Sequence, residues 1–126
     1  MAEKKVVFVA FAIEDERQRD FLKGQSLHTD CPFEYIDMSV KEAYDANWKE
    51  RVRTRIKRSD GVIALVSAST DSSSGQKWEI KCAKEEGKKL IGVWAYSDDR
   101  TKPDVLEGKR IITWTWDGIA NFIDSL

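Results

Sequence analysis

Four short apolar segments constrain the fold of this chain most strongly. They lie at residues 6–11 (VVFVAF), 61–66 (GVIALV), 90–94 (LIGVW) and 111–116 (IITWTW), and apolar residues follow one another in them almost without interruption. Strands of a parallel sheet covered on both faces have this near-continuous pattern, whereas half-solvated strands alternate apolar and polar residues. The four segments therefore predict a buried parallel sheet. A weaker fifth segment, residues 33–36 (FEYI), alternates and is expected at an edge.

Helical patterns separate these predicted strands. Within residues 47–60, Trp48, Val52 and Ile56 recur every four positions, and the opposite face is basic. Further helices are predicted in residues 14–24, 75–89 and 117–126. Strands that alternate with helices predict an α/β three-layer sandwich with helices on both faces of the sheet. At this length we expect a flavodoxin-like, five-stranded parallel sheet with the strand order 2-1-3-4-5.

The size and composition favour one domain over residues 1–126. Hydrophobic residues make up 41% of the 126 residues and charged residues 34%, which is an ordinary globular balance. The formal net charge of −1 gives no general attraction to nucleic acid or anionic lipid. No apolar run approaches the roughly 20 residues that a membrane span needs, and the N-terminal sequence has no signal-peptide pattern. Neither nucleic acid nor a membrane is therefore expected as a partner.

The cysteine and histidine content argues against a metal site. Cys31 and Cys82 are far apart in the sequence, and His28 is the single histidine of the chain. This spacing does not match a zinc site, and no nucleophile motif accompanies His28. We expect reduced thiols, a cytoplasmic location, no metal and no bound cofactor.

The predicted strand order places candidate site residues at one edge of the sheet. Ligands of open parallel sheets bind beyond the carboxyl ends of the strands, beside the first strand. This rule selects residues 10–15 (AFAIED), 37–39 (DMS) and 67–74 (SASTDSSS). Ser67 follows the third strand where a receiver domain has its phospho-acceptor aspartate, and no glycine-rich phosphate motif occurs. Phosphoryl transfer by these routes is excluded, and Asp15 is expected to cap or charge the first helix.

One acidic residue near this edge stands in an unusual context. Glu79 lies between Trp78 and Ile80 in the first turns of the helix that follows the third strand. Most helix acids are solvated or interact with the helix dipole, and that interpretation remains open from the residues alone. A carboxylate beside hydroxyl groups and aromatic surfaces also suits cleavage of an N-glycosidic bond, because it stabilises the oxocarbenium-like transition state.

Several motifs in a fixed order resemble a known family. The segments VFVAF, DMS, RIKRSDGVIALVSAST, WEI and GKKLIGV follow one another along the chain. Their order and spacing are similar to bacterial TIR-like domains, and more narrowly to the TIR-like proteins of Thoeris anti-phage defence. Many relatives have a serine where this chain has Ala10, and some have a tryptophan where it has Gly75.

The resemblance implies an activity and a set of site residues. In this family the glutamate of the helix after the third strand cleaves NAD+, and WEI puts Glu79 at that position. The family pattern also assigns five residues to the nucleotide pocket: Phe11, Ala12, Asp37, Ser39 and Trp78. Packing in the hydrophobic core is an alternative role for the three aromatic residues Phe11, Trp48 and Trp78. An alternative role for Asp37 and Ser39 is to cap the turn after the second strand.

The resemblance also implies the biological setting. We expect an NAD+ nucleosidase or cyclase, with NAD+ as substrate, that releases nicotinamide and an ADP-ribose-derived, cyclic signal for a separate effector protein. Self-association through TIR surfaces is a further expectation. Two alternatives stay open: a non-catalytic TIR interaction module, and an N-glycosidase similar to nucleoside deoxyribosyltransferases. The segment 96–110 is expected to be a loop with a short helical turn.

Overall fold

The computed structural model describes residues 5–12, 15–26, 35–37, 47–98 and 100–126. In this part of the chain five strands form one sheet with the order β2-β1-β3-β4-β5, as the sequence predicts. The strands are Lys5–Ala10 (β1), Tyr35–Asp37 (β2), Gly61–Val66 (β3), Lys89–Trp94 (β4) and Ile111–Ile112 (β5). Neighbouring strands run parallel throughout. All carboxyl ends therefore point to the same edge, which we call the carboxyl edge.

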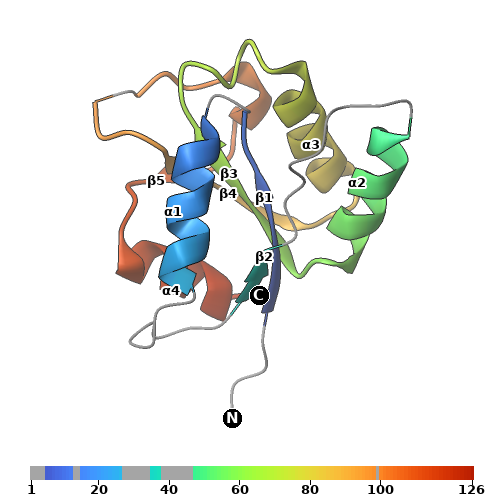
Figure 1. The fold of residues 1–126 in the computed structure, drawn as a ribbon, viewed down its shortest axis with the longest axis horizontal. Coiled ribbons are helices and arrows are strands. Elements are labelled where there is room, and N and C mark those ends of the chain that lie inside the picture. The colour runs from blue at the N-terminus through green and yellow to red at the C-terminus, as the bar shows by residue number, and fades with distance from the viewer. Residues whose placement is uncertain (1–4, 13–14, 27–34, 38–46, 99) are drawn as a thin grey trace.

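Helices cover both faces of the sheet. They are Glu16–Ser26 (α1), Trp48–Arg58 (α2), Ser74–Glu85 (α3) and Trp116–Asp124 (α4). Figure 1 shows α2 and α3 on one side of the sheet and α1 and α4 on the other. The predicted helical turn in the loop 96–110 is confirmed as a short 3-10 helix, η2 (Asp104–Leu106).

Two hydrophobic clusters explain why the strands are apolar at consecutive positions. Val62 and Ala64 of β3 pack with Ile56 of α2 on one face. Ile63 and Leu65 alternate with them and pack on the opposite face, on the side of α1 and α4. Because each face of β3 meets a helical layer, every residue of this strand is buried. This is the three-layer arrangement that continuous apolar runs predict.

The last predicted strand is much shorter than the sequence indicates. The apolar segment 111–116 predicts six strand residues, but β5 contains only Ile111 and Ile112. Thr115 begins the next element instead, because its side-chain oxygen accepts a hydrogen bond from the backbone N–H of Gly118 at 3.0 Å. An N-cap residue of this type ends the strand and starts the helix. The prediction for residues 113–116 was therefore wrong, and α4 begins at Trp116.

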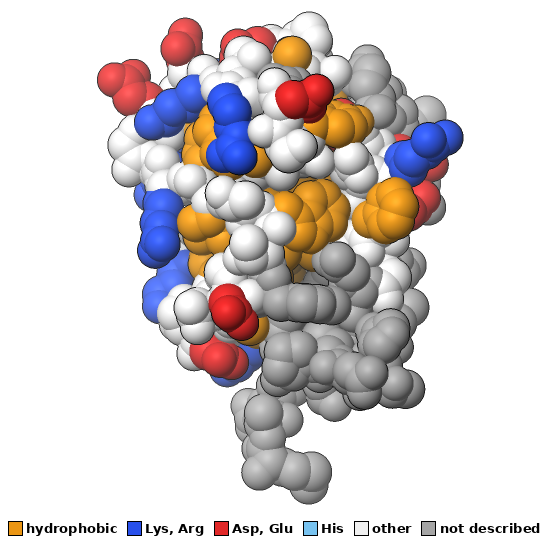
Figure 2. All heavy atoms as spheres, turned by 90° about the vertical axis from the view of Figure 1, so that its left-hand side faces the viewer, with side chains coloured by type: hydrophobic (Ala, Val, Ile, Leu, Met, Phe, Trp, Pro, Cys, Tyr) orange, Lys and Arg blue, Asp and Glu red, His pale blue; other side chains and the backbone are white. Residues whose placement is uncertain are grey.

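The surface includes exposed apolar groups. Figure 2 shows hydrophobic side chains between charged ones on the side of the molecule that lies at the left of Figure 1. Phe21 on α1 is the one large hydrophobic side chain of the described residues that is strongly exposed, at 61%. No helix in the described part of the chain is long and apolar enough to cross a membrane.

Candidate functional site

The serine-rich segment after β3 forms a hydrogen-bonded turn that leads into α3. The backbone N–H of Ser67 donates to the Thr70 hydroxyl at 3.1 Å, and the N–H of Ser73 donates to the carbonyl of Thr70 at 3.1 Å. Ser73 then caps α3, since its hydroxyl accepts from the N–H of Gln76 at 3.1 Å. A serine at this position is a common N-cap residue. The turn places the first residues of α3 at the carboxyl edge.

Gln76 holds the start of α3 against the sheet. Its side-chain Nε2 donates to the carbonyl of Ala10 at 3.1 Å and to the carbonyl of Leu65 at 2.7 Å. These carbonyls belong to the neighbouring strands β1 and β3, so one amide bridges both strands near their carboxyl ends. The side chain is fully buried, and its Oε1 has no hydrogen-bond partner among the described residues. Gln76 therefore fixes the position of the residues that follow it on α3.

Glu79 lies one turn after Gln76 on the buried side of α3. The residue is only 4% exposed. Burial raises the pKa of the Glu79 carboxyl from 4.5 to about 8, because a charged carboxylate loses its hydration in this environment. Within the described residues, no ion pair or hydrogen bond offsets that effect. At neutral pH the free protein therefore holds Glu79 mostly as the neutral acid, and a cationic group placed nearby would favour its ionised form.

Asp15 lies at the centre of a second polar cluster at the carboxyl edge. Its Oδ2 accepts a hydrogen bond from the Ser67 hydroxyl at 2.5 Å, and its Oδ1 accepts one from the Tyr96 hydroxyl at 3.0 Å. Asp15 directly precedes α1, Ser67 follows β3 and Tyr96 follows β4. The expectation that Asp15 serves the first helix is thus incomplete, because its buried carboxylate joins the loops that follow three strands.

The two predicted pocket residues that follow β1 are buried. Phe11 is 5% exposed, and the guanidinium carbon of Arg19 lies over its ring, 5.2 Å from the ring centre. The ring belongs to the cluster on the side of α1 and α4, whereas Glu79 is on α3, on the opposite side of the sheet. Ala12 is fully buried. This packing is the alternative role of Phe11, and its contact with a nucleotide stays a prediction.

Trp78 lies between α2 and α3. Its ring meets that of Trp48 edge to face, with ring centres 5.2 Å apart. The side-chain nitrogen of Lys49 lies 5.8 Å from the Trp78 ring centre, and the guanidinium carbon of Arg53 lies 5.4 Å from it. A hollow of about 300 Å³ lies beside this pair and is also lined by lysines. Trp78 thus packs α3 against α2, next in sequence to Glu79.

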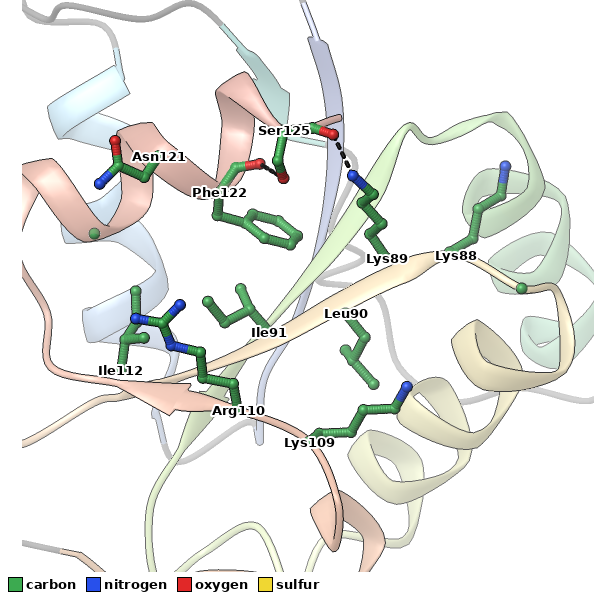
Figure 3. A pocket seen from close by; sticks show the side chains of 12 residues that line it. Lys88, Lys89, Leu90, Ile91, Lys109, Arg110, Ile112, Asn121, Phe122 and Ser125 are labelled. Carbon is green, nitrogen blue, oxygen red and sulfur yellow. Dashed lines mark hydrogen bonds between the residues drawn. The ribbon is translucent and has the colours of Figure 1, made fainter.

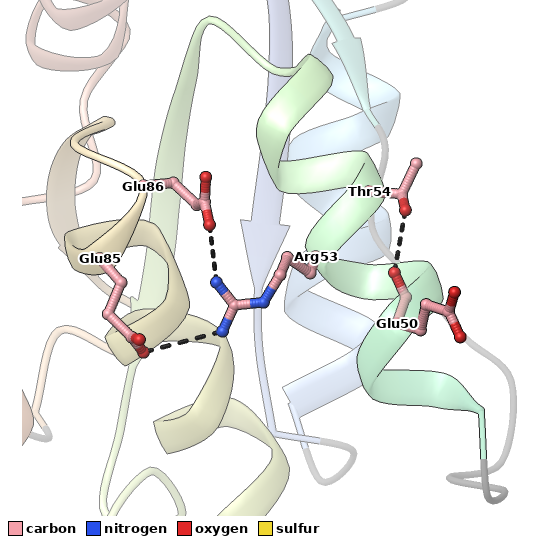
Figure 4. Close-up of polar contacts among 5 residues, drawn as sticks. All are labelled: Glu50, Arg53, Thr54, Glu85 and Glu86. Carbon is pink, nitrogen blue, oxygen red and sulfur yellow. Dashed lines mark hydrogen bonds and ion pairs between the residues drawn. The ribbon is translucent and has the colours of Figure 1, made fainter.

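Ionic contacts reinforce the packing of α2 on α3 further along both helices. Nη1 of Arg53 contacts an oxygen of Glu86 at 2.6 Å, and Nη2 lies 3.8 Å from an oxygen of Glu85 (Figure 4). Cys82 on α3 is fully buried, and this burial raises the pKa of its thiol. This region is structural, and its neutral thiol is a poor nucleophile.

Not all predicted site residues fall within the described structure. Asp37 is the last residue of β2 and pairs with Val7 of β1, which also pairs with Gly61, the first residue of β3. Its backbone therefore lies level with the amino end of β3, three residues before β1 ends at Ala10, and its contact with a nucleotide stays a prediction. Its side chain and the whole of Ser39 lie outside the described residues. The structure therefore puts Trp78 and Glu79 in the middle of α3, just after its first turn, and it puts Phe11 in the core.

Gln76 and Tyr96 of this edge were missed by reasoning from the sequence, whereas Ser67 lies in the selected segment 67–74. Gln76 precedes Glu79 by three positions, so the helical period could have identified its buried amide. Ser67 and Tyr96 each follow a predicted strand, which signals the carboxyl edge, but their common partner Asp15 is distant in the sequence.

In the described part of the chain, no group of three or more histidine, cysteine or acidic residues could hold a metal ion.

Comparisons with known proteins agree with this architecture. Among solved structures, the CMP N-glycosidase BcmB from Clostridium botulinum is 18% identical, with a TM-score of 0.60 over 97% of this chain and 100% of that chain. A 3-dehydroquinate dehydratase-like protein from Bifidobacterium longum is 16% identical, with a TM-score of 0.50 over 98% of this chain and 94% of that one. At such low identities the likeness shows a shared fold.

Sequence comparison gives the family. A search of curated proteins found no significant match. The family model described as Thoeris protein ThsB, TIR-like domain, matches residues 8–100, which is well over half of the chain. This span contains the second half of β1, the serine-rich turn, and the whole of α3 and β4. The chain therefore belongs to the family of the Thoeris protein ThsB, TIR-like domain.

Proposed function

We propose that this protein is an NAD+ nucleosidase that breaks the bond between nicotinamide and ribose, with Glu79 as the catalytic residue. The observation that carries the proposal is the buried Glu79 carboxyl in α3, one turn after Gln76, whose amide donates to carbonyls near the carboxyl ends of β1 and β3. Open α/β sheets bind their ligands at the carboxyl edge. Membership of the ThsB TIR-like family supports the same position for the chemistry.

The raised pKa of Glu79 fits a cationic substrate. A carboxyl with a pKa of about 8 is mostly neutral in the free protein at pH 7. The nicotinamide ring of NAD+ carries a positive charge, so substrate binding lowers the pKa of the carboxyl and promotes its ionisation. The carboxylate then faces a ribose that develops positive charge in the transition state, in a site with little water. This interaction is stronger in the transition state than in the ground state, as catalysis requires.

The bond breaks without a strong acid. The electron pair of the C1′–N bond goes to the nicotinamide nitrogen, and nicotinamide leaves as a neutral molecule. Water then attacks C1′ and loses a proton, which gives ADP-ribose; attack by a group of the substrate itself gives a cyclic product. We propose the cyclic product as a signal for a separate effector protein. Gln76 contributes by holding the start of α3, and therefore Glu79, against β1 and β3.

Glu79→Gln tests the proposal, with nicotinamide release from NAD+ as the measurement. The substitution preserves size and removes the charge, so we expect a loss of at least about 100-fold in kcat. Glu85→Gln is the matched control, because Glu85 is an exposed acid on the same helix, and its activity should equal that of the unmodified protein. Equal activity of the Glu79→Gln variant and the unmodified protein would refute the assignment.

A second candidate is an N-glycosidase that acts on a nucleoside monophosphate. The fold is similar over nearly the whole chain to a protein described as a CMP N-glycosidase. Both candidates use a carboxylate and an oxocarbenium-like transition state. Parallel assays with NAD+, CMP and deoxynucleosides separate them: release of cytosine without release of nicotinamide would favour the second candidate.

A non-catalytic interaction module is the alternative from another class. Such a module would tolerate Glu79→Gln and would lose its function when an exposed contact residue changes. Phe21→Glu is a suitable surface variant, because Phe21 is 61% exposed on α1. Loss of phage protection in the Phe21→Glu strain, with full protection in the Glu79→Gln strain, would support the module.

A further inference from the structure

A second hollow lies at the edge of the sheet opposite Glu79. Its volume is about 630 Å³, which falls in the range of pockets that bind small molecules. It is formed by the residues after α3, the amino ends of β4 and β5, and α4 (Figure 3). Gly87 at its rim follows Glu79 by eight positions, or about 12 Å along a helix. The hollow is therefore distinct from the proposed catalytic site.

The charges around this hollow are all positive. Lys88, Lys89, Lys109 and Arg110 line it, and no acidic residue is among its lining residues. The side chain of Lys89 donates a hydrogen bond to the backbone carbonyl of Ser125 at the end of α4. Lys88, Lys109 and Arg110 make no ion pair with any residue in the described ranges. Three cations without a paired acid favour an anionic ligand.

The floor of the hollow is apolar. The ring of Phe122 and the side chains of Ile91 and Ile112 face the space that the guanidinium of Arg110 enters (Figure 3). An inorganic anion would gain little from this surface. A ligand with a flat apolar part and a charged phosphate part would bury the first against Phe122 and present the second to Arg110.

Backbone hydrogen bonds fix the frame that carries these charges. Gly87 has a positive φ of 68°, and the N–H groups of Gly87 and Lys88 donate to the carbonyls of Lys84 and Ala83. This is the Schellman arrangement at a helix C-terminus. The N–H of Gly92 in β4 donates to the carbonyl of Arg110 at 2.9 Å. The backbone around the pocket is thus already ordered without a ligand.

We propose that this hollow is a second binding site, for a nucleotide, with the base against Phe122 and the phosphates at Lys109 and Arg110. It combines the volume of a ligand pocket, an apolar floor and unpaired cations on an ordered frame. The site does not depend on Glu79 or on the NAD+ reaction. It gives the protein a place to sense a nucleotide apart from the place where it acts on one.

Binding of ADP, adenosine and pyrophosphate to the Glu79→Gln protein tests the site. We expect ADP to bind at least about 10-fold more tightly than adenosine or pyrophosphate, and to shift the amide NMR signals of Gly87 and Gly92. The double substitution Lys109→Ala/Arg110→Ala should weaken ADP binding at least about 10-fold. The matched control is Lys57→Ala/Arg58→Ala, which removes two exposed cations from α2 and should change nothing.

Three results would overturn the proposal. The first is that the double variants at Lys109/Arg110 and at Lys57/Arg58 bind ADP with equal affinity. The second is that the protein binds pyrophosphate as tightly as ADP. The third is that ADP shifts only the amide NMR signals of residues around Glu79. Phe122→Leu tests the apolar floor with the fold preserved: it should reduce the affinity for ADP several-fold and leave that for pyrophosphate unchanged. If the affinity for ADP does not change in this variant, the base does not lie against Phe122 and the proposed ligand class is wrong.

Discussion

Gln76 and Glu79 lie one helical turn apart on α3, and their side chains differ in hydrogen bonding. The amide of Gln76 donates to the carbonyls of Ala10 and Leu65, whereas the carboxyl of Glu79 is buried without a hydrogen bond from the described residues. One residue therefore anchors the helix, and the other is left available for chemistry. This division of roles leads to the first three predictions.

The pH dependence of the proposed reaction follows from the pKa of Glu79. If the ionised carboxylate is the active form, kcat/KM should rise about 10-fold per pH unit between pH 6 and pH 7.5 and level off above about pH 8. Initial rates of nicotinamide release in buffers of constant ionic strength measure this profile. A profile that falls over the same range would mean that the neutral acid is the reactive form.

The stability of the fold should depend on pH through the same group. The pKa of Glu79 is about 8 in the folded protein and near 4.5 in the unfolded chain, so its stabilising contribution is complete below about pH 4.5 and is lost as the pH rises through 8. Glu79→Gln removes this loss. The difference in unfolding free energy between the variant and the unmodified protein should therefore depend on pH. From pH 5 to pH 8.5 it should change in favour of the variant by on the order of 2–4 kcal/mol.

Urea unfolding of both proteins at the two pH values provides the measurement for this second prediction. Glu85→Gln is again the control, since this exposed acid should show no such difference. An identical effect of Glu79→Gln at pH 5 and pH 8.5 would show that the carboxyl is hydrated in the folded protein.

Gln76 is predicted to be a positioning residue. Gln76→Met keeps the shape of the side chain and leaves the carbonyls of Ala10 and Leu65 without their donor, which should cost about 1–3 kcal/mol of stability. It should lower kcat more than it changes KM, because it displaces Glu79 from the reacting bond. A change in stability with unaltered kcat would make Gln76 purely structural. Lys77→Met, on the neighbouring half-buried position, is the control.

Two glycines should respond to alanine in opposite directions. Gly87 has a φ of 68°, which alanine adopts with strain, so Gly87→Ala should lower the free energy of unfolding by about 1 kcal/mol. Gly24 lies within α1 with open space where a Cβ would be, so Gly24→Ala should raise it by about 0.5–1 kcal/mol. Thermal unfolding of the pair measures both effects. Equal shifts of the same sign would contradict the backbone geometry at Gly87.

The sequence predicts the sheet well because the pattern that marks each strand lies within a few consecutive residues. Each of the segments 6–11, 61–66 and 90–94 is apolar at successive positions, and each is a strand between two helical layers. The segment 111–116 is also mostly apolar, yet its last four residues are not strand. A single side-chain bond at Thr115 decides this, and apolar patterning does not report such a bond.

The site is less predictable because its contacts join distant residues. Glu79 was identified from its position after the third strand, but the burial that raises its pKa depends on packing between elements. The bonds from Ser67 and Tyr96 to Asp15 span 52 and 81 positions. A phenylalanine such as Phe11 suits both a ligand contact and a core position, so the sequence does not distinguish the two roles. Only the fold shows that Arg19 lies over its ring.

The short strand β5 has a consequence for assembly. Ile111 and Ile112 are the only residues that extend the described sheet on that side, and Thr115 turns the chain into α4 three residues later. An edge strand of two residues offers too few free backbone N–H and C=O groups for another chain to pair with it as an added strand. Copies of this protein that associate on this side must therefore meet through side chains of α4 and the neighbouring loops, and fibril-like growth of the sheet is blocked there.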